Sequence, residues 1–265
     1  MLMERVKREP FKVLGVVVGI VIDNKDPDAH YRVKVKYPWV AESGDYADVK
    51  DAEDFRSNWC RIATFMAGKD RGAFWLPEVD DEVLIAFEHG DVRRPFVIGS
   101  LWNGVDTTIH ANSEQNGKNS FRSIRSRSGH MLQFVDKKDD KTERIVLQNL
   151  VKAKDEEKDP KQRDGHWIAL DQSGSVDQIE IYDHTQEHYI LIDTKNKKIT
   201  IECKTGDMLI KAEKTITMEC TDLVVKASAS IKQESGSTTD IKAGSNMTVT
   251  ASGKLTEKGA VIELN

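Results

Sequence analysis

Short runs of alternating apolar and polar residues recur along the first part of the chain. In residues 30–38 (HYRVKVKYP), apolar side chains alternate with basic ones, a period of two that is typical of a strand with one buried face. Four further runs of this character lie at 13–22, 58–64, 82–91 and 94–102. Five such strands predict an all-β domain over residues 13–105, a small barrel such as the OB-fold, preceded by an N-terminal arm at 1–12.

The alternation returns in the middle of the chain. Runs that begin near residues 130, 144, 166, 178 and 189 each predict another short strand. Before them, residues 106–129 are rich in Asn, Ser, Gly and Arg, and we expect a connector there. Between the runs that begin near 144 and 166, residues 151–165 (VKAKDEEKDPKQRDG) combine dense charge with a lack of large apolar side chains. This composition predicts an exposed insertion.

The C-terminal part repeats a strand-like unit about every eight residues. Its expected inward positions are Ile201, Ile210, Met218, Val225, Gln233, Ile241 and Val249. A small residue follows each of them two places later, at Cys203, Ala212, Cys220, Ala227, Ser235, Ala243 and Ala251. No Phe, Trp, Tyr, Pro or His occurs from 194 to 265, so any interior here is narrow.

The geometry of this repeat limits the fold. Eight extended residues span only about 26 Å, so a coil made of one such unit could not enclose a packed core. Either several units form one coil of a single chain, or three chains each supply one face. Three chains that each supply one apolar stripe would bury one another and leave few free strand edges. We therefore expect residues 130–265 to form a needle, an intertwined trimeric, triple-stranded β-helix. An antiparallel meander with regular turns is the alternative.

Composition narrows the function classes. The chain has 44 acidic and 39 basic residues and a net charge of −5, which gives no reason to expect a nucleic-acid partner. Three cysteines are too few for a disulfide scaffold and favour a reducing compartment. The apolar run 13–22 is too short to cross a membrane and lacks a signal-peptide cleavage site. We expect synthesis in the cytoplasm.

No constellation of residues predicts catalysis, a cofactor or a metal ion. His184 and His188 share a strand face but would lie about 13 Å apart, too far to chelate one ion. A carboxylate group that could suggest acid–base chemistry falls at a strand entry and a hairpin, where an exposed rim is the simpler interpretation: Asp80, Asp81, Glu82 and Glu88. We expect a protein that is not an enzyme.

The segment RGAFWLPEVDDEVLIAFEHGDVRRPFVIGSLWNG (71–104) resembles the OB-domain signature of the central spike proteins of contractile injection machines. These are the baseplate assembly protein V spikes of phages and the VgrG spikes of type VI secretion. YRVKVKYPWV, WCRIATFMAG and RSIRSRSGHMLQF are similar to that family in the same order. The resemblance implies a homotrimer with an OB-fold collar and a β-helix needle, which organises the centre of a baseplate and pierces a cell envelope.

The resemblance also implies partners. Only about a dozen residues precede the expected barrel, so a separate hub protein is expected at that end. At the other end, a PAAR-type tip protein would bind Val261, Ile262 and Leu264. Arg122, Arg125 and Arg127 would lie at the joint between collar and needle. The target membrane would be contacted only transiently. The assembly could be either a phage virion or a bacterial injection apparatus.

Two other functions stay open on the sequence alone. One is an OB-fold binding module, which would need aromatic residues interleaved with a basic groove. The other is a tailspike-like glycan-degrading protein, which would need carboxylates beside aromatic sugar platforms. The repeat region lacks such platforms after Tyr189.

Overall fold

The computed structural model describes residues 12–42, 55–111, 118–137, 142–152, 158–174 and 176–263. Within these residues the secondary structure is almost entirely β, as the sequence predicts. The chain divides into two compact units, Met1–Met208 and Leu209–Asn265. The first unit holds a closed barrel, a seven-stranded sheet and a small two-stranded sheet.

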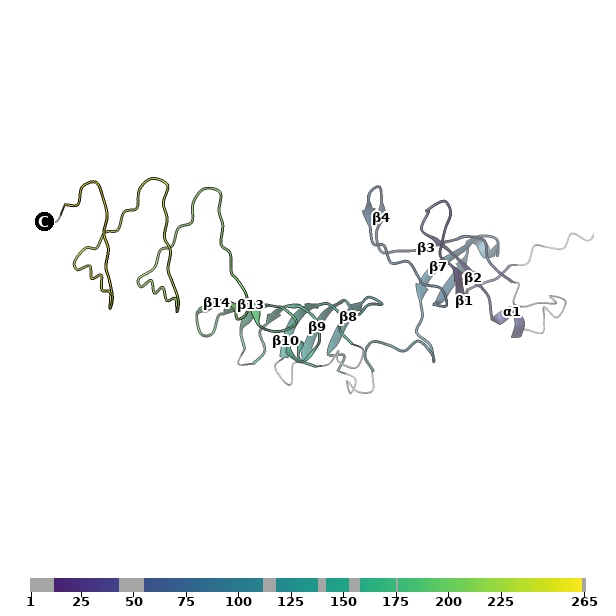
Figure 1. Cartoon of the computed structure of the whole chain (residues 1–265). Coiled ribbons are helices and arrows are strands. Elements are labelled where there is room, and N and C mark those ends of the chain that lie inside the picture. The colour runs from purple at the N-terminus through teal and green to yellow at the C-terminus, as the bar shows by residue number, and fades with distance from the viewer. Residues whose placement is uncertain are drawn as a thin grey trace, which may run out of the picture. The chain divides into compact units, whose positions relative to one another are not determined.

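The barrel confirms the five strands predicted in the first part of the chain. They are β1 (Val16–Asp23), β2 (Arg32–Lys36), β3 (Cys60–Ile62), β6 (Glu82–Phe87) and β7 (Pro95–Ser100). They close in the order β1-β2-β3-β7-β6. Figure 1 labels β1, β2, β3 and β7 of this barrel. The β3–β7 pair is parallel and every other pair is antiparallel. This small closed barrel is consistent with an OB-fold.

Alternate residues of these strands form the barrel core. Val21, Val33 and Ile85 are fully buried. Gly19 of β1 also faces inward, where a Cβ atom would lie only 3.2 Å from Ile85 and 3.3 Å from Val35. The interior is therefore packed too tightly at this point for any larger residue.

Several short elements lie in the connections between the barrel strands. They are α1 (Trp39–Glu42), the hairpin strands β4 (Ala67–Gly68) and β5 (Arg71–Gly72), and the 3₁₀ turn η3 (Glu88–Gly90). The Tyr31 hydroxyl anchors the hairpin segment, because it accepts a hydrogen bond from Trp75 N and donates one to Trp75 O, both at 2.9 Å.

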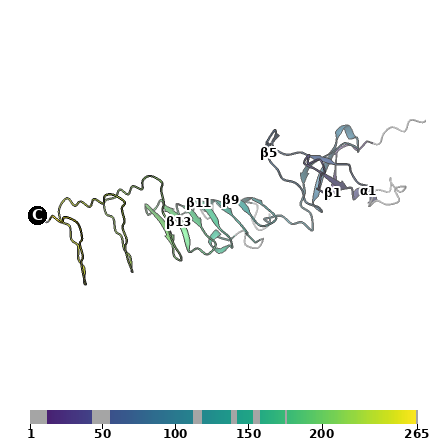
Figure 2. The ribbon, with the colours of Figure 1, turned by 45° about the horizontal axis from the view of Figure 1, so that its top comes forward.

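The seven-stranded sheet is an antiparallel meander. Its strands are β8 (Phe121–Arg125), β9 (Met131–Lys137), β10 (Thr142–Gln148), β11 (Trp167–Asp171), β12 (Gln178–Tyr182), β13 (His188–Asp193) and β14 (Lys198–Cys203). Each pairs with the next, and β9, β11 and β13 follow one another along the sheet in Figure 2. The predicted connector at 106–129 is wrong in one respect, because β8 lies within it and pairs with β9.

The second unit contains neither helix nor strand among its described residues. From 204 to 263 every residue is exposed, and the segment, drawn in green to yellow, runs out and back in repeated excursions (Figures 1 and 2). The two halves of the predicted needle therefore differ. Residues 130–203 pair within one chain, as in the meander alternative, whereas an interchain β-helix in the tail stays a prediction.

Candidate assembly interface

One face of the seven-stranded sheet carries two ladders of large apolar side chains. The strand register places their members directly opposite one another. The first ladder, from β8 to β14, is Ile124, Leu132, Leu147, Ile168, Ile181, Ile190 and Ile201. The second, from β9 to β14, is Phe134, Ile145, Leu170, Ile179, Ile192 and Ile199.

These ladders are open to solvent in the single chain. Apart from Leu132, which is half-buried, their members are exposed by between 37% at Ile192 and 68% at Ile199. A groove of about 710 Å³ follows the first ladder, and another of about 710 Å³ follows the second. Contiguous apolar surface of this extent marks an interaction site in a soluble protein.

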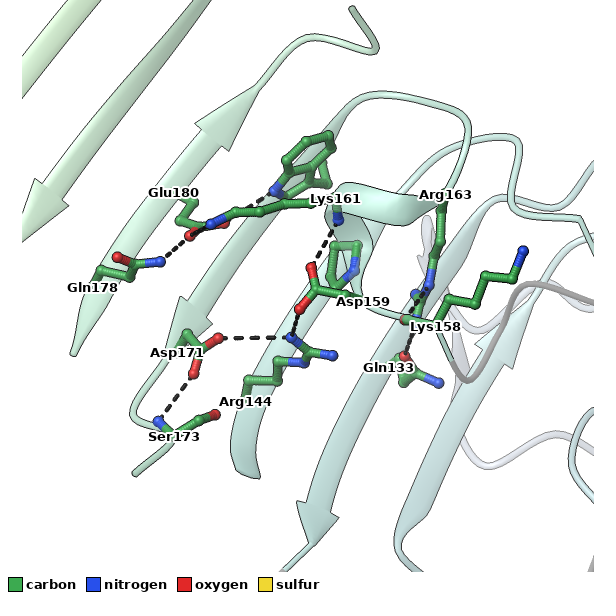
Figure 3. Close-up of polar contacts among 12 residues, drawn as sticks. Gln133, Arg144, Lys158, Asp159, Lys161, Arg163, Asp171, Ser173, Gln178 and Glu180 are labelled. Atoms are coloured by element: carbon green, nitrogen blue, oxygen red, sulfur yellow. Dashed lines mark hydrogen bonds and ion pairs between the residues drawn. The ribbon is translucent and has the colours of Figure 1, made fainter. Parts of the chain in front are cut away.

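Part of the opposite face of the sheet is covered. Residues 158–166, which we name the strap, lie over it and include the 3₁₀ turn η5 (Pro160–Gln162). Arg163 is 4% exposed and donates from Nη2 to Gln133 Oε1 at 2.9 Å and from Nη1 to Gln148 Oε1 at 3.3 Å (Figure 3). Both glutamines are buried in the sheet.

The exposed insertion predicted at 151–165 holds for only part of its described residues, and residues 153–157 lie outside them. Five described residues are exposed, namely Lys152, Lys158, Lys161, Gln162 and Asp164, whereas Val151, Pro160 and Arg163 are buried. The Arg163 guanidinium does not need solvent, because the sheet supplies hydrogen-bond acceptors for it. Gly165 has φ +100°, and a Cβ atom there would overlap the carbonyl oxygen of Asn149. The strap thus needs glycine where it rejoins the sheet.

Two ion-pair groups fix the strap further (Figure 3). Arg144 Nη1 lies 3.0 Å from Asp159 Oδ2 and 3.7 Å from Asp171 Oδ2. Burial acts to raise the pKa of the Asp159 carboxyl, but the hydrogen bonds from Lys161 N and Arg144 outweigh it, and the pKa is lowered. Asp159 therefore stays ionised and holds the strap to β10.

Lys161 makes the second group. Its Nζ atom lies 2.8 Å from Glu180 Oε1, and the Trp167 indole N–H donates to Glu180 Oε2 at 3.2 Å. Trp167, Tyr182 and Tyr189 stack across β11, β12 and β13, with ring centroids 4.8 and 4.7 Å apart. These rings and charges contact one another, so this part of the sheet differs in character from the exposed apolar face.

The three predicted joint arginines are held by separate partners. Arg122 pairs with Asp136 on the adjacent strand. Arg125 Nη2 donates to Val151 O at 2.6 Å. Arg127 pairs with Glu78, in the segment that leads into β6. Arg127 thus contacts the segment that leads into the barrel strand β6, and a joint role for all three arginines stays a prediction.

The predicted tip residues are exposed where they are described. Val261 is 77% and Ile262 is 51% exposed, while Leu264 lies outside the described residues. Their role stays a prediction.

Two of the histidine and carboxylate candidates make local contacts. His184 N donates to His166 Nδ1 at 3.1 Å, and Glu88 pairs with Arg94 at 3.1 Å. Among the described residues, no group of three His, Cys, Asp or Glu side chains could hold a metal ion. In the same part of the chain, no helix has the length and apolar character needed to cross a membrane.

Sequence reasoning did not identify the two ladders. The signal was present, since runs such as QIEIYD (178–183) alternate strictly. What the alternation could not reveal is that every strand from β9 to β14 contributes one large apolar residue to each of two ladders on the same face of the sheet. The strand register alone establishes that.

Part of the chain matches a known protein family. Residues 17–102 match the family described as the type VI secretion system/phage-baseplate injector OB domain. The type VI secretion system spike proteins VgrG1b and VgrG1c of Pseudomonas aeruginosa are each 27% identical to the chain, over 170 and 167 residues. Each match covers 62% of this chain and 21% or 22% of the relative. VgrG1a of the same organism is 32% identical over 110 residues, 40% of this chain and 16% of the relative.

The resemblance drawn from the sequence is thereby confirmed: residues 17–102 match the injector OB-domain family, and the chain is similar to VgrG spike proteins. It spans about a fifth of the length of the VgrG spike proteins that it matches. The relatives are spike proteins by name, which supports a structural role.

Proposed function

We propose that three copies of this chain, with its injector OB domain at residues 17–102, assemble into the central spike of a contractile injection machine. In this assembly the two apolar ladders of each copy face a common axis, and the strap faces outward. The single observation that carries the proposal is the pair of exposed ladders, a sheet face that one chain cannot bury.

The chemistry of the two sheet faces supports this orientation. Removal of water from the apolar face lowers the free energy, whereas the strap already covers the opposite face with hydrogen bonds and ion pairs. Two copies could also stack their apolar faces as a sandwich. Three copies account in addition for the tail, whose apolar stripe of about eight-residue period is too thin for a two-chain core.

In the proposed spike the tail forms the triple-stranded β-helix. Its backbone has no strand partner within the described part of one chain. Three tails wound about one axis would pair these amides and bury side chains such as Ile210, Ile241 and Val249 together. The resulting rod would be rigid and free of long loops, which suits a part that organises a baseplate and pierces an envelope by force rather than by catalysis.

Two partners complete the proposal. A hub protein would bind the barrel, and a PAAR-type tip protein would bind apolar residues near 261–262. Replacing Val261 and Ile262 with Asp should abolish capture of the tip protein in a pull-down without dissociating the trimer. Capture at the original strength would exclude these two residues as the tip contact.

Hydrogen exchange tests the proposed architecture directly. In the assembled spike, amides within residues 209–263 should exchange far more slowly than in an unfolded chain, because interchain hydrogen bonds protect them. Protection should disappear when the protein is diluted below its assembly concentration. Exchange at the unfolded rate in a confirmed trimer would contradict the β-helix.

A further inference from the structure

A single row of residues runs around the outer wall of the barrel. Strand pairing places Arg32 opposite Arg61, Arg61 opposite Phe96, Phe96 opposite Ala86, and Ala86 opposite Val16. We name these five residues the barrel row. It begins with two cations on β2 and β3 and continues as apolar surface on β7, β6 and β1.

The cations of this region are held against aromatic rings. The guanidinium carbon of Arg61 lies 5.5 Å from the Phe96 ring centroid. Beside the row, Lys34 Nζ lies 4.6 Å from the Trp59 ring centroid. Cation–π contact at these distances orients the charged groups without neutralising them. Lys34 and Arg61 therefore present fixed positive charge to a partner.

Arg32 differs from these two cations. Its guanidinium donates to both carboxylate oxygens of Asp26, at 2.6 and 2.7 Å, and to Asp28 at 2.7 Å. Within the described residues, no ion pair of this kind is recorded for Lys34 or Arg61. In that part of the chain, Lys34 and Arg61 therefore carry positive charge that no ion pair of this kind offsets.

The other end of the row is apolar and accessible. Val16 is 53% exposed, and Ile98, which neighbours Phe96 on β7, is 44% exposed. Phe96 itself is half-buried beneath Arg61. A partner that covers this wall therefore meets cations on one side and aliphatic surface on the other.

We propose that the barrel row, with Lys34 and Ile98 beside it, is the surface that docks the hub, and that it binds a protein segment in which carboxylates flank apolar side chains. This inference rests on the proposed function for the existence of a hub, and it adds where the hub binds and by what chemistry. Carboxylates would pair with Lys34 and Arg61 while apolar side chains cover Val16 and Ile98.

The same features argue against single-stranded nucleic acid as the occupant. Bases stack on open aromatic faces, whereas side-chain cations already cover the Trp59 and Phe96 rings. The aliphatic end of the row offers nothing to a phosphate backbone.

Binding to defined probes tests the proposal with the full chain. Fluorescence anisotropy would compare a labelled copolymer of glutamate and tyrosine with polyglutamate and with a thymidine oligonucleotide of equal charge. The copolymer should bind most tightly, because it alone supplies both carboxylates and apolar groups. Tighter binding of the oligonucleotide, or equal binding of all three probes, would overturn the proposal.

A matched pair of variants locates the contact. Lys34→Glu with Arg61→Glu should weaken copolymer binding by at least about tenfold, since two attractive pairs become repulsive. Lys69→Glu with Arg71→Glu changes the net charge by the same amount, but on the exposed hairpin. This variant should weaken copolymer binding less than about twofold. Equal losses in both variants would overturn the assignment of the site.

Ile98→Thr separates the apolar contribution. It should weaken binding of the copolymer but leave binding of polyglutamate unchanged. A loss for neither probe would contradict the apolar half of the proposal. The mass of each variant in solution, measured alongside, shows whether the trimer persists, so a failure of docking is distinguishable from a failure of assembly.

Discussion

Ile168 and Ile181 lie directly opposite each other on β11 and β12, and each remains 43% exposed in the single chain. Paired aliphatic residues at the centre of a seven-stranded sheet normally lie in a core. Their exposure here is repeated along two complete ladders. The arrangement is that of one side of an interface whose other side, in the proposed spike, is another copy of the sheet.

A charge within the first ladder should prevent assembly. Ile181→Asp would place a carboxylate from each copy in an apolar interface, where an unpaired buried charge costs several kcal/mol. We expect sedimentation velocity to show monomers with an unchanged far-UV circular dichroism spectrum. Lys198→Asp, on an exposed residue of the other face, should leave the trimer intact. Identical behaviour of the two variants would contradict the assigned orientation.

The stability that the strap gives to the sheet should depend on the Arg163 guanidinium. Arg163→Ala leaves Gln133 and Gln148 buried without their shared donor, a loss of about 2–4 kcal/mol of unfolding free energy. Urea denaturation followed by tryptophan fluorescence would measure it. Gln162→Ala, at an exposed position of the same strap, should cost less than about 0.5 kcal/mol. A small effect at Arg163 would mean that the strap does not stabilise the sheet.

The barrel should lose stability in mild alkali. Burial raises the pKa of the Cys60 thiol from its usual value near 9 to about 11. An unfolded thiol ionises first, so this contribution is complete below pH 9 and is lost as the pH rises to about 11. At about 1.4 kcal/mol per pKa unit, the loss is roughly 2–3 kcal/mol.

Denaturation midpoints between pH 8 and 11 test this dependence. Cys60→Ala should be less stable at pH 8 but should lose less stability on going to pH 11. Burial likewise raises the pKa of Tyr37, which adds to the loss in both proteins. Parallel pH profiles for the two proteins would show that Cys60 is not the titrating group.

The register of the tail is tested by two neighbouring positions. Ile241 is an expected inward residue of the β-helix and Lys242 an outward one. Ile241→Asp should destroy the amide protection of residues 209–263, because three carboxylates would meet near one axis. Lys242→Asp should leave the protection unchanged. Equal losses would mean that the inward stripe is wrongly placed.

The barrel could be predicted because its strands have one buried face. Val33 and Val35 alternate with charged residues in sequence and are fully buried in the structure. The strand β8 was missed because FRSIR is mostly polar, and only its pairing with β9 shows that it belongs to the sheet. Local pattern indicates a strand best where side-chain burial, rather than backbone pairing, decides the structure.

The strap shows a different limit of sequence reasoning. The charges of Asp159, Lys161 and Arg163 predict exposure when each is considered alone. The structure pairs them with Arg144, Glu180 and two buried glutamines, partners that are distant along the chain. The ladders show the opposite case. Strict alternation predicts that their apolar residues are buried, but in a single chain these residues are exposed, because the partner that would cover them is absent.

The mass of the purified full chain in solution tests the central claim most directly. Size-exclusion chromatography with multi-angle light scattering should give three times the 29.9 kDa mass of one chain, over a wide concentration range. The account predicts this value because three apolar sheet faces bury one another about an axis. A folded monomer with intact β-structure, or a stable dimer, would contradict it.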